Sequence, residues 1–301
     1  MAGSTAHIIQ SLIANTVIAA AKGVAAVITG SGAMLAETIH SSADCGNQLL
    51  LLFGVKQARK PATPEHPLGY GRALYFWSFM VAMLLFTGGG MFSIYEGVHK
   101  IRHPEPVGDI VVAVIVLVVA LAIEGWATLG NIVELNKRRG ATPFGRFLRE
   151  TKDSDLVVVF GENSAAVLGL ALALVALVLA KTTGNGRWDG AGSLAVGVVL
   201  VAVALFLAVE IKSLLVGESA DPAIEREVRA MVAADPNVDA VLMLLTVQQG
   251  PGEIVVAMKL RFKDGLATGG DLCKVINAFE DRLRAARPEA RWCFIEPDTE
   301  A

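Results

Sequence analysis

The chain alternates long apolar runs with short polar breaks up to about residue 216, and then its pattern changes. Six of the runs approach the roughly 20 residues that an α-helix needs to cross a bilayer. Gly- and Pro-containing breaks separate the runs, as expected between helices. The six predicted transmembrane helices are 8–29, 33–56, 74–99, 108–135, 156–180 and 190–215.

Residues 218–301 have the mixed apolar and charged pattern of a soluble domain. Two helices on a small sheet are typical of a ferredoxin-like α+β domain, suited to dimerisation or regulation. The predicted elements are a helix at 222–234, strands at 238–248 and 253–262, a helix at 269–286 and a strand at 291–296. The predicted fold is therefore a six-span transmembrane helix bundle, residues 1–217, followed by a cytoplasmic ferredoxin-like domain, residues 218–301.

Composition agrees with a membrane protein. The 301 residues are 53% hydrophobic and 18% charged, against about a quarter charged in soluble domains. The net charge of −3 argues against nucleic acid as a partner. The three cysteines, Cys45, Cys273 and Cys293, lack the CxxC spacing of a thiolate zinc site. No nucleophile–base pair, phosphate loop or HExxH helix indicates an enzyme.

The short loops carry an uneven share of Lys and Arg. Ten lie in the 2–3 and 4–5 loops, and four lie on the opposite side. Because Lys and Arg accumulate on the cytoplasmic side, both termini are predicted to be cytoplasmic. The start of the chain lacks a basic segment and a cleavage site typical of a signal peptide. Together with the Ala-, Val- and Gly-rich spans, this predicts a multi-pass protein of a bacterial inner membrane.

The second predicted span carries four polar residues at spacings of three, four and three, which place them on one helix face. They are Glu37, His40, Asp44 and Asn47. Ionisable groups in hydrocarbon are costly and mark an ion path or a buried pair. His40 and Asp44 therefore have three interpretations: a mutual pair, a proton relay or a metal site.

The fifth predicted span adds Glu162 and Asn163 to the polar groups in the membrane. Histidine together with carboxylates suits a divalent cation, and a bound dication offsets like charges that lipid makes expensive. The metal site is therefore the favoured interpretation, with His40, Asp44, Glu162 and Asn163 as its residues.

Three further charged residues fall within predicted spans. Lys22 is expected to reach an interface by snorkelling. Asp189 is expected at the outer start of the sixth span, a helix end where charge is tolerated. Glu124 lies deep in the fourth span, and packing against a polar partner or a role in an ion path are both open.

Several motifs along the chain carry a family resemblance. They are His40-Ser-Ser-Ala-Asp44 with Asn47, His66-Pro-Leu-Gly-Tyr-Gly-Arg72, Gly161-Glu-Asn-Ser-Ala-Ala-Val-Leu-Gly169, Glu218-Ser-Ala220 and Phe294-Ile-Glu-Pro-Asp298. Through them the sequence resembles the cation diffusion facilitator family of metal–proton antiporters over essentially its whole length. The fifth-span motif looks like the zinc transporter-9-like branch.

The resemblance implies a homodimer in a lipid bilayer, with one transport site per subunit between the second and fifth spans. It implies efflux of a divalent cation, usually Zn²⁺, in exchange for H⁺, with His40 and Asp44 as ligands. The fifth span departs from the family pattern, because Val159 and Asn163 occupy its ligand positions. Glu162 lies about 100° round the helix from Asn163. Either the helix is rotated or unwound so that Glu162 binds, or water replaces protein ligands.

Two other functions stay open at this point. Residues 218–301 contain no histidine, and the fifth-span ligand pair is incomplete. A non-transporting metal sensor or scaffold would have these features. A transporter of Mn²⁺, Fe²⁺ or Co²⁺ is the other alternative, because the residues alone do not name the ion.

Overall fold

The computed structural model describes residues 2–105, 107–151, 154–265 and 268–299. The chain divides into two compact units, and each is described by itself. The helical unit comprises Met1–Lys56, Phe76–Arg149 and Ser154–Lys212. The tail unit comprises Gln57–Tyr75, Glu150–Asp153 and Ser213–Ala301.

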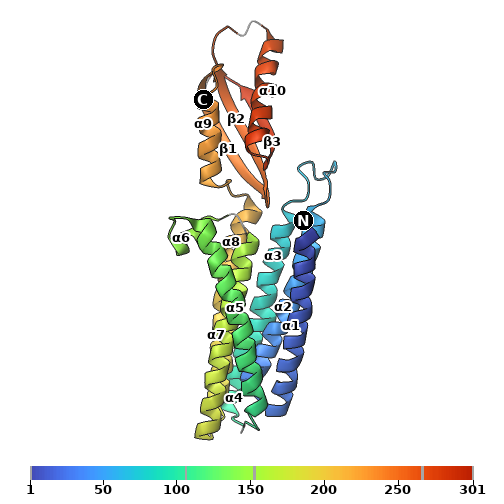
Figure 1. The fold of residues 1–301 in the computed structure, drawn as a ribbon, viewed down its shortest axis with the longest axis vertical. Helices are drawn as coiled ribbons and strands as arrows, with labels where there is room; N and C mark the ends of the chain where they lie inside the picture. The colour runs from blue at the N-terminus through green and yellow to red at the C-terminus, as the bar shows by residue number, and fades with distance from the viewer. Residues whose placement is uncertain (1, 106, 152–153, 266–267, 300–301) are drawn as a thin grey trace. The chain divides into compact units, whose positions relative to one another are not determined.

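Long helices form the helical unit, and α5 and α7 pack side by side in it (Figure 1). The helices up to the tail are α1 Ala2–Thr29, α2 Gly32–Ala58, α3 Ala73–Leu84, η1 Leu85–Met91, α4 Phe92–Arg102, α5 Val111–Arg139, α6 Phe144–Glu150, α7 Ser154–Thr183 and α8 Arg187–Val216. Each predicted span coincides with a long helix or, for the third span, with the run α3–η1–α4. The short helix α6 was not predicted, and η1 is a π-helical segment that hydropathy does not reveal.

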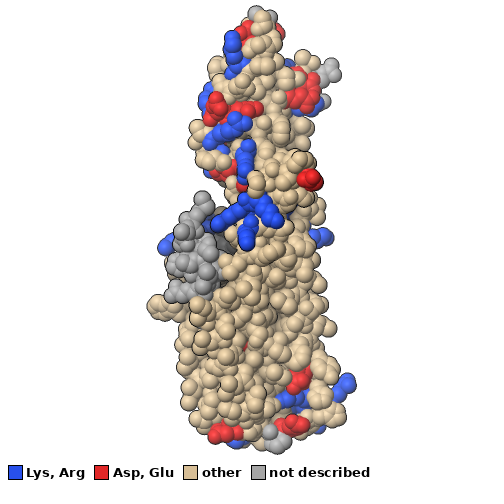
Figure 2. Space-filling view, turned by 90° about the vertical axis from the view of Figure 1, so that its right-hand side faces the viewer, with Lys and Arg blue, Asp and Glu red and all other residues tan. Residues whose placement is uncertain are grey.

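Fewer helices than predicted have both the length and the apolar composition that a transmembrane span needs. Among the described residues, four helical runs are long and apolar enough to cross a bilayer: Ala73–Arg102, Val111–Arg139, Val157–Thr183 and Arg187–Val216. In α1 the apolar part is the shorter stretch Asn15–Thr29. Charged residues interrupt α2, so its mean apolarity is low. Six spans therefore stay a prediction, although one face of the helical unit is nearly bare of charge (Figure 2).

The third run and α8 pack through glycine. A methyl carbon at Gly97 would lie 2.5 Å from the backbone nitrogen of Leu194, and one at Gly197 would lie 2.7 Å from that of Ile94. Both distances are shorter than real Cβ contacts, so these positions need glycine. The Ser193 hydroxyl also donates to the Ser93 carbonyl at 2.9 Å. Small residues here let two helix backbones approach closely, as is common in membranes.

The tail contains the five elements that its sequence pattern predicts. They are α9 Pro222–Ala233, β1 Val238–Gly250, β2 Glu253–Phe262, α10 Gly269–Ala286 and β3 Ala290–Pro297. The sheet order is β1-β2-β3, with β1 antiparallel to β2 and β2 parallel to β3. The helix α10 is the crossover that the parallel pair requires.

One face of the sheet forms the core of the tail. Alternate β2 residues are buried there, from Ile254 and Val256 to Leu260. Phe279 and Leu283 of α10 belong to the same cluster. Successive side chains of a strand point to opposite faces, so apolar residues at every second position lie on one face. The pattern of apolar residues therefore determined which face of the sheet packs into the core.

Candidate functional site

The polar face of α2 is buried within the helical unit. Glu37, His40 and Asn47 are fully buried. The His40 Nδ1 atom lies 3.7 Å from Asp44 Oδ1, which is an ion-pair distance but too long for a hydrogen bond. The structure therefore brings His40 and Asp44 together, as the sequence predicts, without joining them directly.

The second half of the predicted site lies on α7. The Asn47 side-chain amide donates to Glu162 Oε1 at 2.6 Å, so this carboxylate faces α2. The carbonyl of Asn163 accepts from the Thr128 hydroxyl of α5 at 3.4 Å. The predicted residues thus lie on two helices, His40 and Asp44 on α2 and Glu162 and Asn163 on α7, and the hydrogen bond of Asn47 to Glu162 joins the two helices. Across the described ranges, no three His, Cys, Asp or Glu side chains are grouped closely enough to hold a metal ion.

Several polar atoms on this α2 face lack a hydrogen-bond partner. Within the part of the chain that the structure describes, these atoms are Glu37 Oε1, both ring nitrogens of His40, Asp44 Oδ1 and Asn47 Oδ1. Buried polar atoms are nearly always hydrogen-bonded, so each exception calls for an explanation. The oxygens and one ring nitrogen of a neutral imidazole can ligate a cation, and their residues follow one another along the helix. The face is therefore suited to a positively charged ligand.

Glu124 of α5 is a third carboxylate near this face. It interacts electrostatically with Asp44 and with Glu162. Its side chain is half-buried. The sequence left packing and ion-path roles open for Glu124, and only the packing of α5 on α7 brings it near the other two carboxylates.

The expectation for Lys22 was wrong. Its side chain is 1% exposed and does not snorkel to an interface. The Lys22 ammonium donates to Glu37 Oε2 at 3.0 Å and to the Ser41 hydroxyl at 2.7 Å. Hydropathy places a lysine along a span but cannot tell that a glutamate of the neighbouring helix lies within reach of it.

Asp189 lies at a helix end, as the sequence predicts, but this end is not exposed. The residue is in the first turn of α8 and is 1% exposed. Its carboxylate accepts from the backbone N–H groups of Gly32 at 2.6 Å and Ala33 at 3.2 Å, and from the Ser31 hydroxyl. Lys100 completes the group at 3.2 Å. Asp189 therefore caps the N-terminus of α2 from another helix and fixes where the polar face begins.

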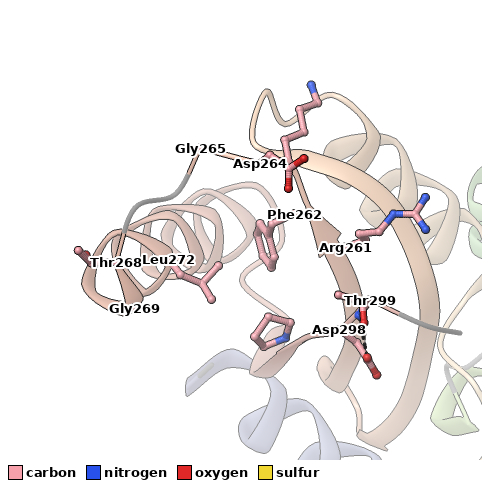
Figure 3. Close-up of a pocket in the computed structure, with 11 residues that line it drawn as sticks. Arg261, Phe262, Asp264, Gly265, Thr268, Gly269, Leu272, Asp298 and Thr299 are labelled. Atoms are coloured by element: carbon pink, nitrogen blue, oxygen red, sulfur yellow. Dashed lines mark hydrogen bonds between the residues drawn. The ribbon is translucent and has the colours of Figure 1, made fainter.

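A cavity in the tail, between the end of β2 and the start of α10, has a volume of about 460 Å³ (Figure 3). Two of its charged residues have partners: Arg261 pairs with Asp239 at 2.7 Å, and Asp298 with Lys259 at 3.0 Å. Of the described residues that line it, none is a histidine or cysteine. The cavity is thus a weaker candidate for a metal site than the α2 face.

Comparison with known proteins shows the family of the chain. The profile of the cation efflux transmembrane domain matches residues 8–216. The chain is 32% identical to the "Proton-coupled zinc antiporter SLC30A9, mitochondrial" of Xenopus laevis, over 80% of this chain and 44% of that protein. The human protein of the same name is 31% identical over 82% of this chain and 44% of its own length. "Metal tolerance protein C4" of Arabidopsis thaliana is 32% identical, with 78% and 52% covered. The chain spans about half the length of these curated relatives.

These relatives overturn the predicted location. The antiporters that match four fifths of the chain are named as mitochondrial proteins of vertebrates, so the prediction of a bacterial inner membrane with cytoplasmic termini is wrong. The physical reason is that the apolar composition of a span reflects the hydrocarbon core of a bilayer. Ala-, Val- and Gly-rich spans suit one membrane as well as another.

The family match extends over all the long helices and includes the α2 face and its α7 partner. The family is one of cation transport and not of enzymes, in keeping with the absence of a catalytic motif from the sequence. This chain belongs to the family of the cation efflux transmembrane domain.

Proposed function

We propose that this chain exchanges a divalent cation, with Zn²⁺ as the first candidate, for protons across a membrane. The row of unpartnered ligating atoms on α2, opposite Glu162, is the observation that carries the proposal. The names of the antiporters that the chain resembles support zinc and the proton as the exchanged ions.

His40 and Asp44 of α2, with Glu162 and Asn163 of α7, form the proposed site. The Asn47–Glu162 hydrogen bond supports Glu162 as the α7 ligand, because the carboxylate reaches α2 from an uninterrupted helix. No unwinding of α7 is needed. Asn163 supplies a neutral oxygen, and Asn47 holds Glu162 until the cation arrives.

Competition between metal and protons couples the two fluxes. A metal needs neutral histidine and ionised carboxylates, so metal binding releases protons and protonation expels the metal. His40 is suited to this exchange because only a neutral imidazole can bind a metal, so a proton and the metal compete for the same ring. Rocking of the helices around a fixed site then exposes it to one side of the membrane at a time.

The proposal includes six spans, with α1 and α2 as the two that composition alone does not identify. The polar residues of α2 are buried against neighbouring helices, so α2 does not present them to lipid. It also includes a homodimer, with the ferredoxin-like tail, residues 218–301, as the dimerising or regulatory part. Crosslinking of the full chain in membranes tests the dimer.

A flux panel in proteoliposomes tests the proposed function. Wild-type protein is compared with Glu162→Ala and Asn163→Ala for Zn²⁺, Mn²⁺, Fe²⁺, Co²⁺ and Cd²⁺ under a pH gradient. We expect gradient-driven Zn²⁺ flux that Glu162→Ala abolishes and Asn163→Ala reduces. Wild-type flux in Glu162→Ala would exclude the carboxylate as a ligand, and a preference for Mn²⁺, Fe²⁺ or Co²⁺ would replace zinc as the substrate.

A metal sensor or scaffold is the second candidate. It is favoured by the absence, among the described residues, of an assembled group of three metal-binding side chains. A sensor binds metal and stays a folded dimer, with no flux of any of the five ions. The same panel, combined with Zn²⁺ titration of the purified chain, separates the two functions.

A further inference from the structure

The buried ion pair of Lys22 and Glu37 has no role in the proposed exchange of metal and protons. Their side chains are 1% and 0% exposed, and they join α1 to α2. Burying two charges is expensive, and apolar residues of similar size often stabilise a fold as well or better. The pair therefore calls for a reason other than stability.

The pair lies next to the α2 face on two sides. The Lys22 ammonium is bonded to the Ser41 hydroxyl, and Ser41 precedes Asp44 by three residues, which makes them neighbours on the helix surface. Glu37 precedes His40 by the same spacing. The free oxygen of Glu37 points toward Gly169 of α7, where an added methyl would collide with it.

The two charges of the pair do not act equally on the site. Lys22 interacts electrostatically with His40, Asp44 and Glu124. Among these three described groups, His40 alone also interacts electrostatically with Glu37. Asp44 and Glu124 thus experience the positive member of the pair more than the negative one, whereas for Glu162 an interaction with neither is found.

We propose that Lys22 is a built-in competitor of the transported cation, whose fixed positive charge beside Asp44 and Glu124 weakens metal binding enough for release. Glu37 and Ser41 hold the ammonium in place, so Lys22 sets affinity without touching the metal. This inference rests on the proposed function, because it concerns the affinity of the same site.

Transport gives such a competitor a use. A site with several carboxylates and a histidine in a medium of low dielectric binds a dication tightly, since Coulomb energies rise as the dielectric falls. A transporter must also let its cargo go. A fixed charge of the same sign lowers the affinity in both access states and leaves the ligands themselves intact.

The test measures Zn²⁺ affinity by calorimetry on the purified full chain in detergent, for wild type, Lys22→Gln, Glu37→Gln and the double variant. We expect Lys22→Gln to bind Zn²⁺ more tightly by about fivefold or more, which is the lower end of ordinary coupling between sites. Glu37→Gln should bind more weakly. The double variant should lie between Lys22→Gln and wild type, because the charge nearer the carboxylates is gone.

The double variant also protects the test from a folding failure, since it leaves no unpaired charge in the membrane. Lys100→Gln is the matched control, because Lys100 is ion-paired in the same unit but with Asp189 at the start of α2; its affinity should equal that of wild type. Weaker or unchanged Zn²⁺ binding in both Lys22→Gln and the double variant would overturn the proposal and leave the pair a structural one.

Flux measurements separate this inference from the proposed function. In proteoliposomes, Lys22→Gln should lower both KM and the maximal rate, because tighter binding slows release. If wild type carries no ion at all, the proposed function fails while the order of affinities still decides the role of Lys22. If wild type transports and the affinities do not follow the expected order, only the inference fails.

Discussion

Charged and polar side chains have opposite surroundings in the two units of this chain. In the tail, two charged residues of the cavity are paired: Arg261 with Asp239, and Asp298 with Lys259. On the α2 face of the helical unit, His40 and Asp44 keep buried atoms without hydrogen-bond partners. Charged side chains that are paired at a solvent-exposed surface indicate a structural role. Polar atoms without a hydrogen-bond partner on a buried face indicate a ligand.

The two units also pack differently. The tail buries large side chains such as Phe279 and Leu283 against a sheet. The helical unit brings backbones together at Gly97 and Gly197. In the tail, the hydrophobic effect of water drives apolar side chains together. Lipid supplies no hydrophobic effect between helices, so close packing at small residues stabilises the helical unit instead. Four predictions test this contrast, beginning with the largest expected effect.

Replacement of Asp44 by Ala should reduce Zn²⁺ flux to background while the protein stays folded. The substitution removes a ligand of the proposed site and leaves the close helix contacts unchanged. Flux in proteoliposomes and the melting temperature in detergent are the two measurements. Wild-type flux in Asp44→Ala would show that the α2 face is structural, like the pairs of the tail.

Replacement of Leu283 by Ala should destabilise the tail by about 2–5 kcal/mol, as expected for a fully buried leucine. Leu283→Met is the matched control, since it conserves volume and should cost less than about 1.5 kcal/mol. Urea unfolding is followed by labelling of the buried Cys293 thiol, with Cys45 and Cys273 replaced by Ser. Equal midpoints for the two variants would contradict the role of Leu283 in the core.

Replacement of Gly97 by Ala should destabilise the helical unit by about 1–3 kcal/mol through overpacking. The added methyl would collide with the backbone of α8, which cannot move aside as a side chain can. Gly125→Ala is the control in α5, where no heavy atom lies within 4 Å of the added methyl. A melting temperature lowered equally by both substitutions would mean that helix propensity, not close contact, explains the loss.

The smallest effect concerns the pH dependence of the tail. The hydrogen bond from Arg287 lowers the pKa of Glu227. A carboxyl whose pKa is lower folded than unfolded stabilises the fold above its unfolded pKa, about 4.3 for Glu. That stabilisation is lost as the pH falls through the folded pKa. Because the pair is exposed, we expect a small difference.

Hydrogen exchange of α9 and α10 amides in the full chain measures this effect. Wild type and Glu227→Gln are compared at each pH, so that the intrinsic pH dependence of exchange cancels. Wild type should be better protected at pH 7, and the difference should shrink below the unfolded pKa of about 4.3 and vanish below the lowered pKa of Glu227 in the folded tail. A difference that persists in acid would assign the protection to packing and not to the ion pair.

The sequence predicted much of this molecule correctly. Runs of apolar residues predicted the long helices, and the mixed apolar and charged pattern of 218–301 predicted the tail elements, because both patterns depend on local periodicity alone. The spacing of His40 and Asp44 on α2 also placed them on one face. The α6 helix and the π-helical η1 were missed, since neither has a periodic signal.

Only the tertiary structure decided which side chains of different helices contact one another. The bond of Asn47 to Glu162, the pairing of Lys22 with Glu37 and the cap of α2 by Asp189 all join different helices. Periodicity fixes the face on which a residue lies but not which helix covers that face. Hydrophobic patterning in lipid is nearly uniform around a helix, so packing of small residues and buried polar contacts set the arrangement.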